Sequence, residues 1–199
     1  MSKHRFPFRF AVPLTIAVAS ASVPAAAQDH GMTMPTTGYR AELIRDLDQL
    51  ENKYTGLAQA MSGKYAWRPA EGVRSVSEVF MHAAAGNYLL LNMAGIKPPA
   101  DMKVGNMQEA MATMRQMESV TDEAKVQEAV RQSFAFAKHG IATMSDADLD
   151  TKIQLFGQEA TKRAALHLAV THLHEHLGQS IAYARTNGVT PPWSQAGSN

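Results

Sequence analysis

The chain has 199 residues, of which 45% are hydrophobic and 19% are charged, and this balance excludes a disordered, collagen-like or repeat-array protein. It contains no cysteine, which excludes disulfides, thiolate metal ligands and a cysteine nucleophile. The formal net charge is +1, but residues 1–27 hold three basic side chains and no acid, so the other 16 basic and 18 acidic groups give −2. A surface of this charge has no general attraction for nucleic acid or anionic lipid, and we expect neither as a partner.

Residues 1–27 have the pattern of a secretory signal peptide. Lys3, Arg5 and Arg9 form a basic opening, an apolar stretch follows, and three alanines ending at Ala27 form a cleavage site. The alternative is an uncleaved membrane anchor, but the apolar stretch is short for a spanning helix and contains proline. We therefore predict cleavage after Ala27 and a periplasmic or secreted protein that does not enter the membrane.

Residues 28–37 form a polar tail that we expect to be flexible. Cleavage after Ala27 would place His30 third in the mature chain, where its imidazole, the terminal amine and two backbone nitrogens could bind Cu²⁺ or Ni²⁺ in a square plane. Met32 and Met34 would add soft ligands for Cu⁺. The simpler interpretation, which we favour, is a leader that binds no metal, because so short a match arises easily by chance.

Four segments carry apolar residues at spacings of three and four, the pattern of amphipathic helices. They cover residues 38–61, 75–93, 121–144 and 161–187. The connection 145–159 contains at most a short extended piece at 153–156, and no series of strands is present. The sequence therefore predicts an all-α four-helix bundle in a single domain, residues 38–194, with residues 195–199 disordered.

A shorter helix is expected between the second and third long helices. Met107, Met111, Met114 and Met117 are spaced 4, 3 and 3 residues apart, which places them on one helical face. A methionine stripe could bind Cu⁺. Because methionine commonly fills irregular gaps between packed elements, we predict instead that this stripe belongs to the core.

The last predicted helix offers one pair of histidines that can bind the same ion. His172 and His176 are four residues apart and lie one turn apart on one face, whereas His167 and His174 are separated by about 10.5 Å along the axis. The pair is not the zincin motif, because Leu173 stands where that motif requires glutamate. Surface histidines without a metal are the alternative. The helix's apolar stripe is one residue away from the pair, so both rings should flank the core.

A third ligand could come from the second predicted helix. There His82 is followed by three alanines and Gly86, and such small side chains allow a neighbouring helix to approach closely. Glu78 lies four residues earlier on the same face and could orient the His82 ring by accepting a hydrogen bond. The alternative is a core histidine beside a solvated acid in the first helical turn.

Together these residues resemble the DinB/YfiT-like metal-dependent superfamily. The resemblance covers residues 38–194 and is carried by Ser-Val-Ser-Glu-Val-Phe-Met-His at 75–82, His-Leu-His-Glu-His-Leu-Gly-Gln at 172–179, the Trp-Arg-Pro loop at 67–69 and the ending at 183–194. It implies an up-down-down-up four-helix bundle in which His82, His172 and His176 hold one divalent metal ion. Zinc, nickel and iron are the leading candidates. The resemblance is also compatible with a homodimer.

Relatives of this superfamily include thiol-dependent S-transferases, a mycothiol-dependent isomerase and presumed hydrolases. The resemblance and the donor set therefore predict a metal-dependent hydrolase or S-transferase for an unknown small-molecule substrate. The ion would lower the pKa of a bound water to about 7 or hold a substrate thiolate. Export would separate the protein from the cytosolic thiols that such transferases use.

Three further side chains are candidates for a catalytic role. Gln179 could hydrogen-bond a ligand or a metal-bound water, Tyr183 could line the same cavity, and Glu175 could act as a base. Ordinary packing or solvation is the alternative for each. The competing function is a non-catalytic envelope metal-binding or stress protein, whose structural or sensory ion would have a closed coordination sphere.

Overall fold

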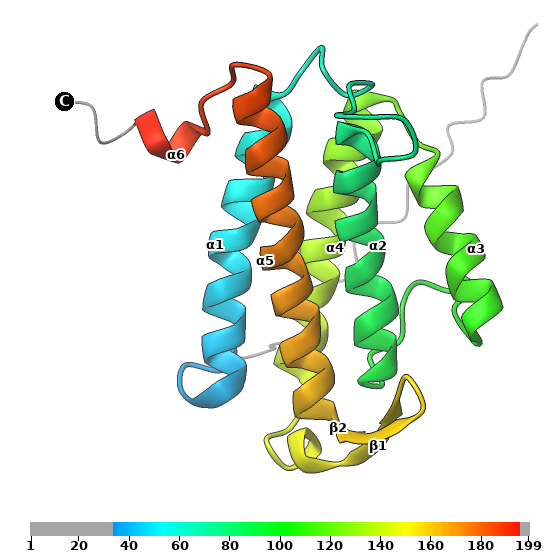
Figure 1. Cartoon of the computed structure of the whole chain (residues 1–199). Coiled ribbons are helices and arrows are strands. Elements are labelled where there is room, and N and C mark those ends of the chain that lie inside the picture. The colour runs from blue at the N-terminus through cyan, green and yellow to red at the C-terminus, as the bar shows by residue number, and fades with distance from the viewer. Residues whose placement is uncertain (1–33, 196–199) are drawn as a thin grey trace, which may run out of the picture. The chain divides into compact units, whose positions relative to one another are not determined.

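The computed structural model describes residues 34–195, which all belong to one compact unit. The predicted signal peptide, His30, Met32 and residues 196–199 lie outside the described residues. Four long helices form a bundle: α1 (Gly38–Ala60), α2 (Val76–Met93), α4 (Glu123–Thr143) and α5 (Lys162–Thr186). In Figure 1, α1 and α5 run in one direction and α2 and α4 run in the opposite one. The predicted all-α, up-down-down-up architecture is confirmed.

Side-chain caps fix where three of these helices begin. The Ser75 hydroxyl accepts a hydrogen bond from the backbone N–H of Glu78, and the Glu78 carboxylate accepts one from the Ser75 N–H, which makes a capping box at the start of α2. Asp122 caps α4 and Thr161 caps α5 in the same way, with a side-chain oxygen accepting from the third helical N–H. These caps set the positions along α2 and α5 at which their histidines occur.

The predicted apolar stripes meet in the centre of the bundle. Tyr54 of α1 lies at the middle of this core, where its ring packs against Phe80 of α2 at a centroid distance of 6.3 Å and against Phe134 of α4 at 5.5 Å. Its buried hydroxyl donates a hydrogen bond of 2.7 Å to the backbone carbonyl of Leu173 on α5. This bond satisfies the buried phenol and ties α1 to α5 next to His172.

The connection between α4 and α5 is more ordered than the sequence indicates. A 3₁₀ turn (Ala147–Asp150) leads into a hairpin of β1 (Lys152–Leu155) and antiparallel β2 (Gln158–Thr161). Phe156 and Gly157 form its two-residue turn, both with positive φ (51° and 81°), as tight hairpin turns require. No residue of either strand is buried. β1 alternates polar and apolar residues (Lys-Ile-Gln-Leu), whereas β2 (Gln-Glu-Ala-Thr) does not, so periodicity predicts only one extended piece there. Helix α6 (Pro192–Gln195) follows α5.

The predicted extra helix exists as α3 (Met107–Glu118), which packs against α2 on the outside of the bundle (Figure 1). The prediction that its methionines belong to the core is wrong for Met107 and Met111, whereas Met117 is partly buried against the core. Met107 is 55% exposed, Met111 is 42% exposed, and no residue of α3 is buried. The reason is that α3 packs on a single neighbouring helix, so its apolar face has no second layer to cover it.

Within residues 34–195, no helix is long and apolar enough to cross a membrane.

Candidate metal centre

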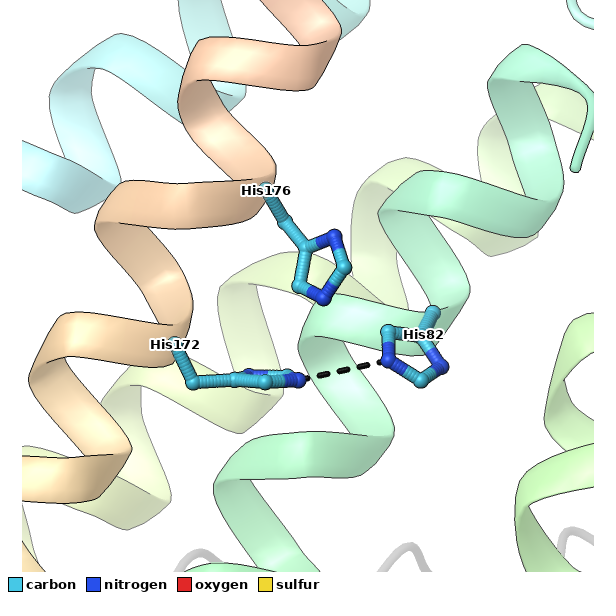
Figure 2. Close-up of side chains that lie close together, drawn as sticks. All are labelled: His82, His172 and His176. Carbon is cyan, nitrogen blue, oxygen red and sulfur yellow. Dashed lines mark hydrogen bonds between the residues drawn. The ribbon is translucent and has the colours of Figure 1, made fainter.

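Three histidines from two helices point toward one another in the bundle. His82 extends from α2, and His172 and His176 extend from successive turns of α5 (Figure 2). One ring nitrogen from each lies within 4.8 Å of the other two, so the group could hold a metal ion. The Nε2 atoms of His82 and His172 are 3.2 Å apart. The structure thus brings together the three histidines that the sequence singled out.

Gly86 makes this close approach of α2 and α5 possible. A Cβ atom placed on Gly86 would lie 2.4 Å from Cε1 and 2.7 Å from Nδ1 of the His172 ring, closer than non-bonded atoms allow. Glycine inside a helix costs about 0.5–1 kcal/mol relative to alanine. Alanine would avoid this cost, but it does not fit at position 86, because the His172 ring occupies the space that its Cβ would need.

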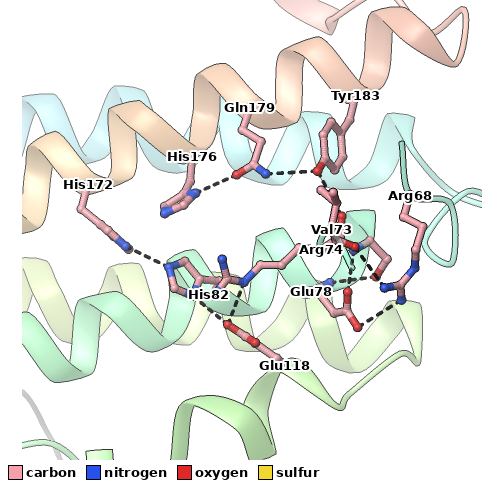
Figure 3. Close-up of polar contacts among 11 residues, drawn as sticks. Arg68, Val73, Arg74, Glu78, His82, Glu118, His172, His176, Gln179 and Tyr183 are labelled. Carbon is pink, nitrogen blue, oxygen red and sulfur yellow. Dashed lines mark hydrogen bonds and ion pairs between the residues drawn. The ribbon is translucent and has the colours of Figure 1, made fainter. Parts of the chain in front are cut away.

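Glu118, at the end of α3, orients the His82 ring. Its Oε1 atom lies 2.7 Å from His82 Nδ1 and 3.0 Å from Nε of Arg74 (Figure 3). A carboxylate can only accept, so the proton of the neutral imidazole is on Nδ1 and the lone pair of Nε2 faces the other histidines. Metal-binding histidines commonly have such a carboxylate partner.

The prediction that Glu78 orients His82 is wrong. Glu78 reaches back to the start of α2, where it completes the capping box with Ser75 and pairs with Arg68 at 3.2 Å. The Ser-x-x-Glu spacing is a capping signature that could have identified this role. The true partner, Glu118, is 36 residues from His82 and is brought to it only by the packing of α3 on α2.

Gln179 and Tyr183 support His176 from the same helix. His176 Nδ1 donates to Oε1 of Gln179 at 2.9 Å, and the Gln179 amide donates to the Tyr183 hydroxyl at 3.1 Å. That hydroxyl donates to the backbone carbonyl of Arg74 at 3.1 Å (Figure 3). The structure therefore places both predicted candidates in a hydrogen-bonded chain that orients the His176 ring. Glu175 is exposed on α5 and does not belong to the histidine group.

Burial favours the neutral imidazoles of His82 and His172. Desolvation lowers the pKa of His172 to about 3, with smaller contributions from the positive charge that His176, His82 and Arg74 can carry. Desolvation also lowers the pKa of His82, partly offset by its hydrogen bond to Glu118. His172 Nδ1 is buried without a hydrogen-bond partner. Neutral imidazole is the form that binds metal ions, so the site is prepared for one at neutral pH.

The metal-free protein should lose stability as the pH falls below about 6.5. An unfolded histidine has a pKa of about 6.5, whereas that of His172 in the fold is about 3. The unfolded state therefore binds more protons between these values, and the stabilisation present above pH 6.5 is lost progressively toward pH 3. Urea unfolding in a chelator at several pH values measures this slope. The His172→Asn protein should have a shallower slope, and equal slopes would contradict the assignment.

Replacing Glu118 and Glu78 separately should distinguish their roles. Glu118→Gln should weaken metal affinity about 10- to 100-fold, because His82 loses its charged hydrogen-bond partner. Glu78→Gln is the matched control and should lower the melting temperature slightly through the weaker cap, with metal affinity unchanged. Competition with a chromogenic chelator measures both affinities. A larger loss in Glu78→Gln than in Glu118→Gln would contradict the contacts described above.

Comparison with known proteins identifies the same fold. The model of the DinB superfamily matches residues 46–180. The structure is similar to a DinB-like protein from Bacillus cereus ATCC 10987, with a TM-score of 0.62 and 16% identity, over 75% of this chain and 93% of that one. It is also similar to a DinB-like protein from Bacillus subtilis, with a TM-score of 0.57, 24% identity and the same coverage. No curated protein matches the sequence. The helical bundle and the match over most of its length establish that the chain belongs to the DinB superfamily.

Proposed function

We propose that the protein is an exported metal-dependent hydrolase or transferase in which His82, His172 and His176 hold one divalent ion. The observation that carries this proposal is the convergence of the three ring nitrogens. Two nitrogens bound to one tetrahedral zinc ion lie about 3.3 Å apart, and the 3.2 Å separation of His82 and His172 fits that value. Three neutral imidazoles suit zinc, nickel or iron.

The composition of the group supports a catalytic rather than a structural ion. Among residues 34–195, the cluster consists of the three histidines and includes no carboxylate. Three protein ligands leave a coordination position for water or substrate, whereas structural zinc sites have four. A divalent ion in such a site supplies Lewis acidity, which activates water or a substrate thiolate. This disfavours the non-catalytic alternative, which needs a closed coordination sphere.

The surrounding side chains orient the ligands. Glu118 and Gln179 each accept the Nδ1 proton of a histidine, so the Nε2 lone pairs of His82 and His176 are available. Arg74 lies beside the group and is ion-paired with Glu118 at 3.0 Å, which holds the carboxylate against His82. Export, inferred from residues 1–27, would keep the protein away from cytosolic thiols and favours hydrolysis over thiol transfer.

Elemental analysis of the tag-free, exported protein tests the proposal. We expect about one equivalent of a divalent metal, which the His82→Ala/His172→Ala/His176→Ala protein should lack. The matched control is His167→Ala/His174→Ala, because these two histidines are exposed on the same helix. Circular dichroism establishes that each variant folds. Metal retained by the triple variant would overturn the site.

Catalysis is tested on the same proteins. Screens with ester, amide and thiol-transfer substrates should find an activity that the native protein has and the triple variant lacks. If His172→Ala removed the metal but left every detected activity intact, the proposed catalytic role would be wrong.

A further inference from the structure

A cavity of about 380 Å³ lies beside the histidine group, between α2, α3 and the tip of the hairpin. Its lining is mostly apolar and includes Met107, Met111 and Met114 of α3, Phe156 of the hairpin turn and His172 itself. The volume is within the range of pockets for small organic ligands, about 300–1,000 Å³. The cavity therefore has the size and lining of a ligand site and extends to one of the proposed metal ligands.

One face of α3 serves both the cavity and the histidines. Met107, Met111, Met114 and Glu118 are spaced 4, 3 and 4 residues apart, so they share a face. The three methionines line the cavity, and Glu118 at the end of the same face contacts His82. The position of α3 thus couples the shape of the cavity to the orientation of the His82 ring.

Three of the apolar side chains that line this cavity are exposed. Met107 and Met111 are 55% and 42% exposed, and Phe156 at the hairpin tip is 59% exposed. Leaving such side chains in water forgoes the stabilisation that burial of apolar surface provides. Methionine is also flexible and polarisable, and it adapts to ligands of different shape.

A polar cleft is lined by the residues that orient two of the histidines. It has a volume of about 540 Å³, and Arg68, Arg74, Glu118 and Gln179 contribute to its walls. Glu118 and Gln179 are the residues that hydrogen-bond His82 and His176. The histidine group is therefore bordered by an apolar cavity through His172 and by a charged cleft through these two partners.

We propose that the substrate is a small amphiphile whose alkyl or aryl group occupies the methionine-lined cavity while its polar head reaches the three histidines. The placement of the head rests on the proposed metal site. The placement of the apolar group rests on the cavity alone, so the two can fail separately.

Binding of straight-chain hydroxamates to the metal-loaded protein tests the proposal. Hydroxamates from acetyl to octanoyl share one metal-binding head and differ only in alkyl length, and the matching primary amides lack that head. We expect affinity measured by calorimetry to rise about fourfold per methylene, from about 0.8 kcal/mol of transfer free energy, and to level off once the cavity is full. In protein labelled with ¹³C-methyl methionine, the methyl signals of Met107, Met111 and Met114 should shift.

Variants separate the cavity from the metal site. Met107→Gln/Met111→Gln should reduce the gain in hydroxamate affinity to less than twofold per methylene and leave acetohydroxamate binding unchanged. The matched control is Met34→Gln, which replaces an exposed methionine outside the cavity lining. This variant should keep the full dependence of hydroxamate affinity on chain length. Affinity independent of chain length, or equal chain-length dependence in the double variant and the native protein, would overturn the proposal.

The amides distinguish the two possible failures. In the triple-histidine variant, long-chain amides should still shift the NMR signals of the cavity methionines. Hydroxamates should no longer bind more tightly than amides of the same length. If the native protein bound no metal, the amide series would still decide whether the cavity accepts alkyl groups. If amides failed to shift these signals while hydroxamates bound irrespective of length, the metal site would stand and the cavity proposal would be wrong.

Discussion

Gly86→Ala should weaken metal binding at least tenfold while leaving the bundle folded. The added Cβ would lie 2.4 Å from Cε1 and 2.7 Å from Nδ1 of His172, so the ring or the helices must move by several tenths of an ångström. Overpacking of this kind costs about 1–3 kcal/mol, partly offset by a gain in helix propensity of about 0.5–1 kcal/mol. The net effect on stability should be small, whereas a ligand displaced from its position should bind the ion much less well.

Gly178→Ala provides the matched control for this substitution. Gly178 also lies inside a helix, α5, but a Cβ there would meet no atom within 4 Å. This variant should bind metal normally and gain about 0.5–1 kcal/mol of stability. Chelator competition and urea unfolding measure both properties. Full metal affinity in Gly86→Ala would mean that the close approach to His172 does not determine the site.

Removal of the metal should produce the largest change in thermal stability. An ion that binds only the folded state stabilises it by about 4 kcal/mol when its free concentration is a thousand times the Kd. For a chain of 150–250 residues each kcal/mol shifts the Tm by about 2–4 °C. We therefore expect the Tm of the metal-loaded protein to exceed that of the stripped protein by about 8–16 °C under these conditions.

The dependence on metal concentration distinguishes a specific site from general salt effects. The shift should grow logarithmically with free metal, and Mg²⁺, which prefers oxygen ligands, should not reproduce it. The triple-histidine variant should melt at the same temperature with and without zinc. If its Tm rose as much as that of the native protein, the stabilising ion would be bound elsewhere.

The helices of the bundle and the histidine group can be predicted from the sequence alone. Apolar spacing is a local property, so the buried stripe that includes Leu47, Leu50 and Tyr54 is predictable without knowledge of the fold. The spacing of His172 and His176 is likewise fixed by helix geometry. His82 could be added because it lies among small residues and because the joint pattern resembles one superfamily.

The sequence pattern also leads to predictions that the structure does not address. The signal peptide, its cleavage after Ala27 and the copper-binding hypothesis for His30 and Met32 concern residues outside 34–195. These remain predictions. A homodimer and export likewise stay predictions, and mass spectrometry of the periplasmic protein and light scattering would test them.

Only the tertiary structure decides which side chains surround the histidines. Glu78 is near His82 in sequence, but a side chain in the first helical turn is drawn back to the free backbone N–H groups, and Glu118 takes its place from another helix. The spacing of the α3 methionines is the same whether they face the core or line a cavity. Whether the methionine face of α3 forms core or cavity wall depends on whether a second layer of structure covers it. Such coverage, like the contact of Gly86 with His172, depends on packing between segments that are distant in the sequence.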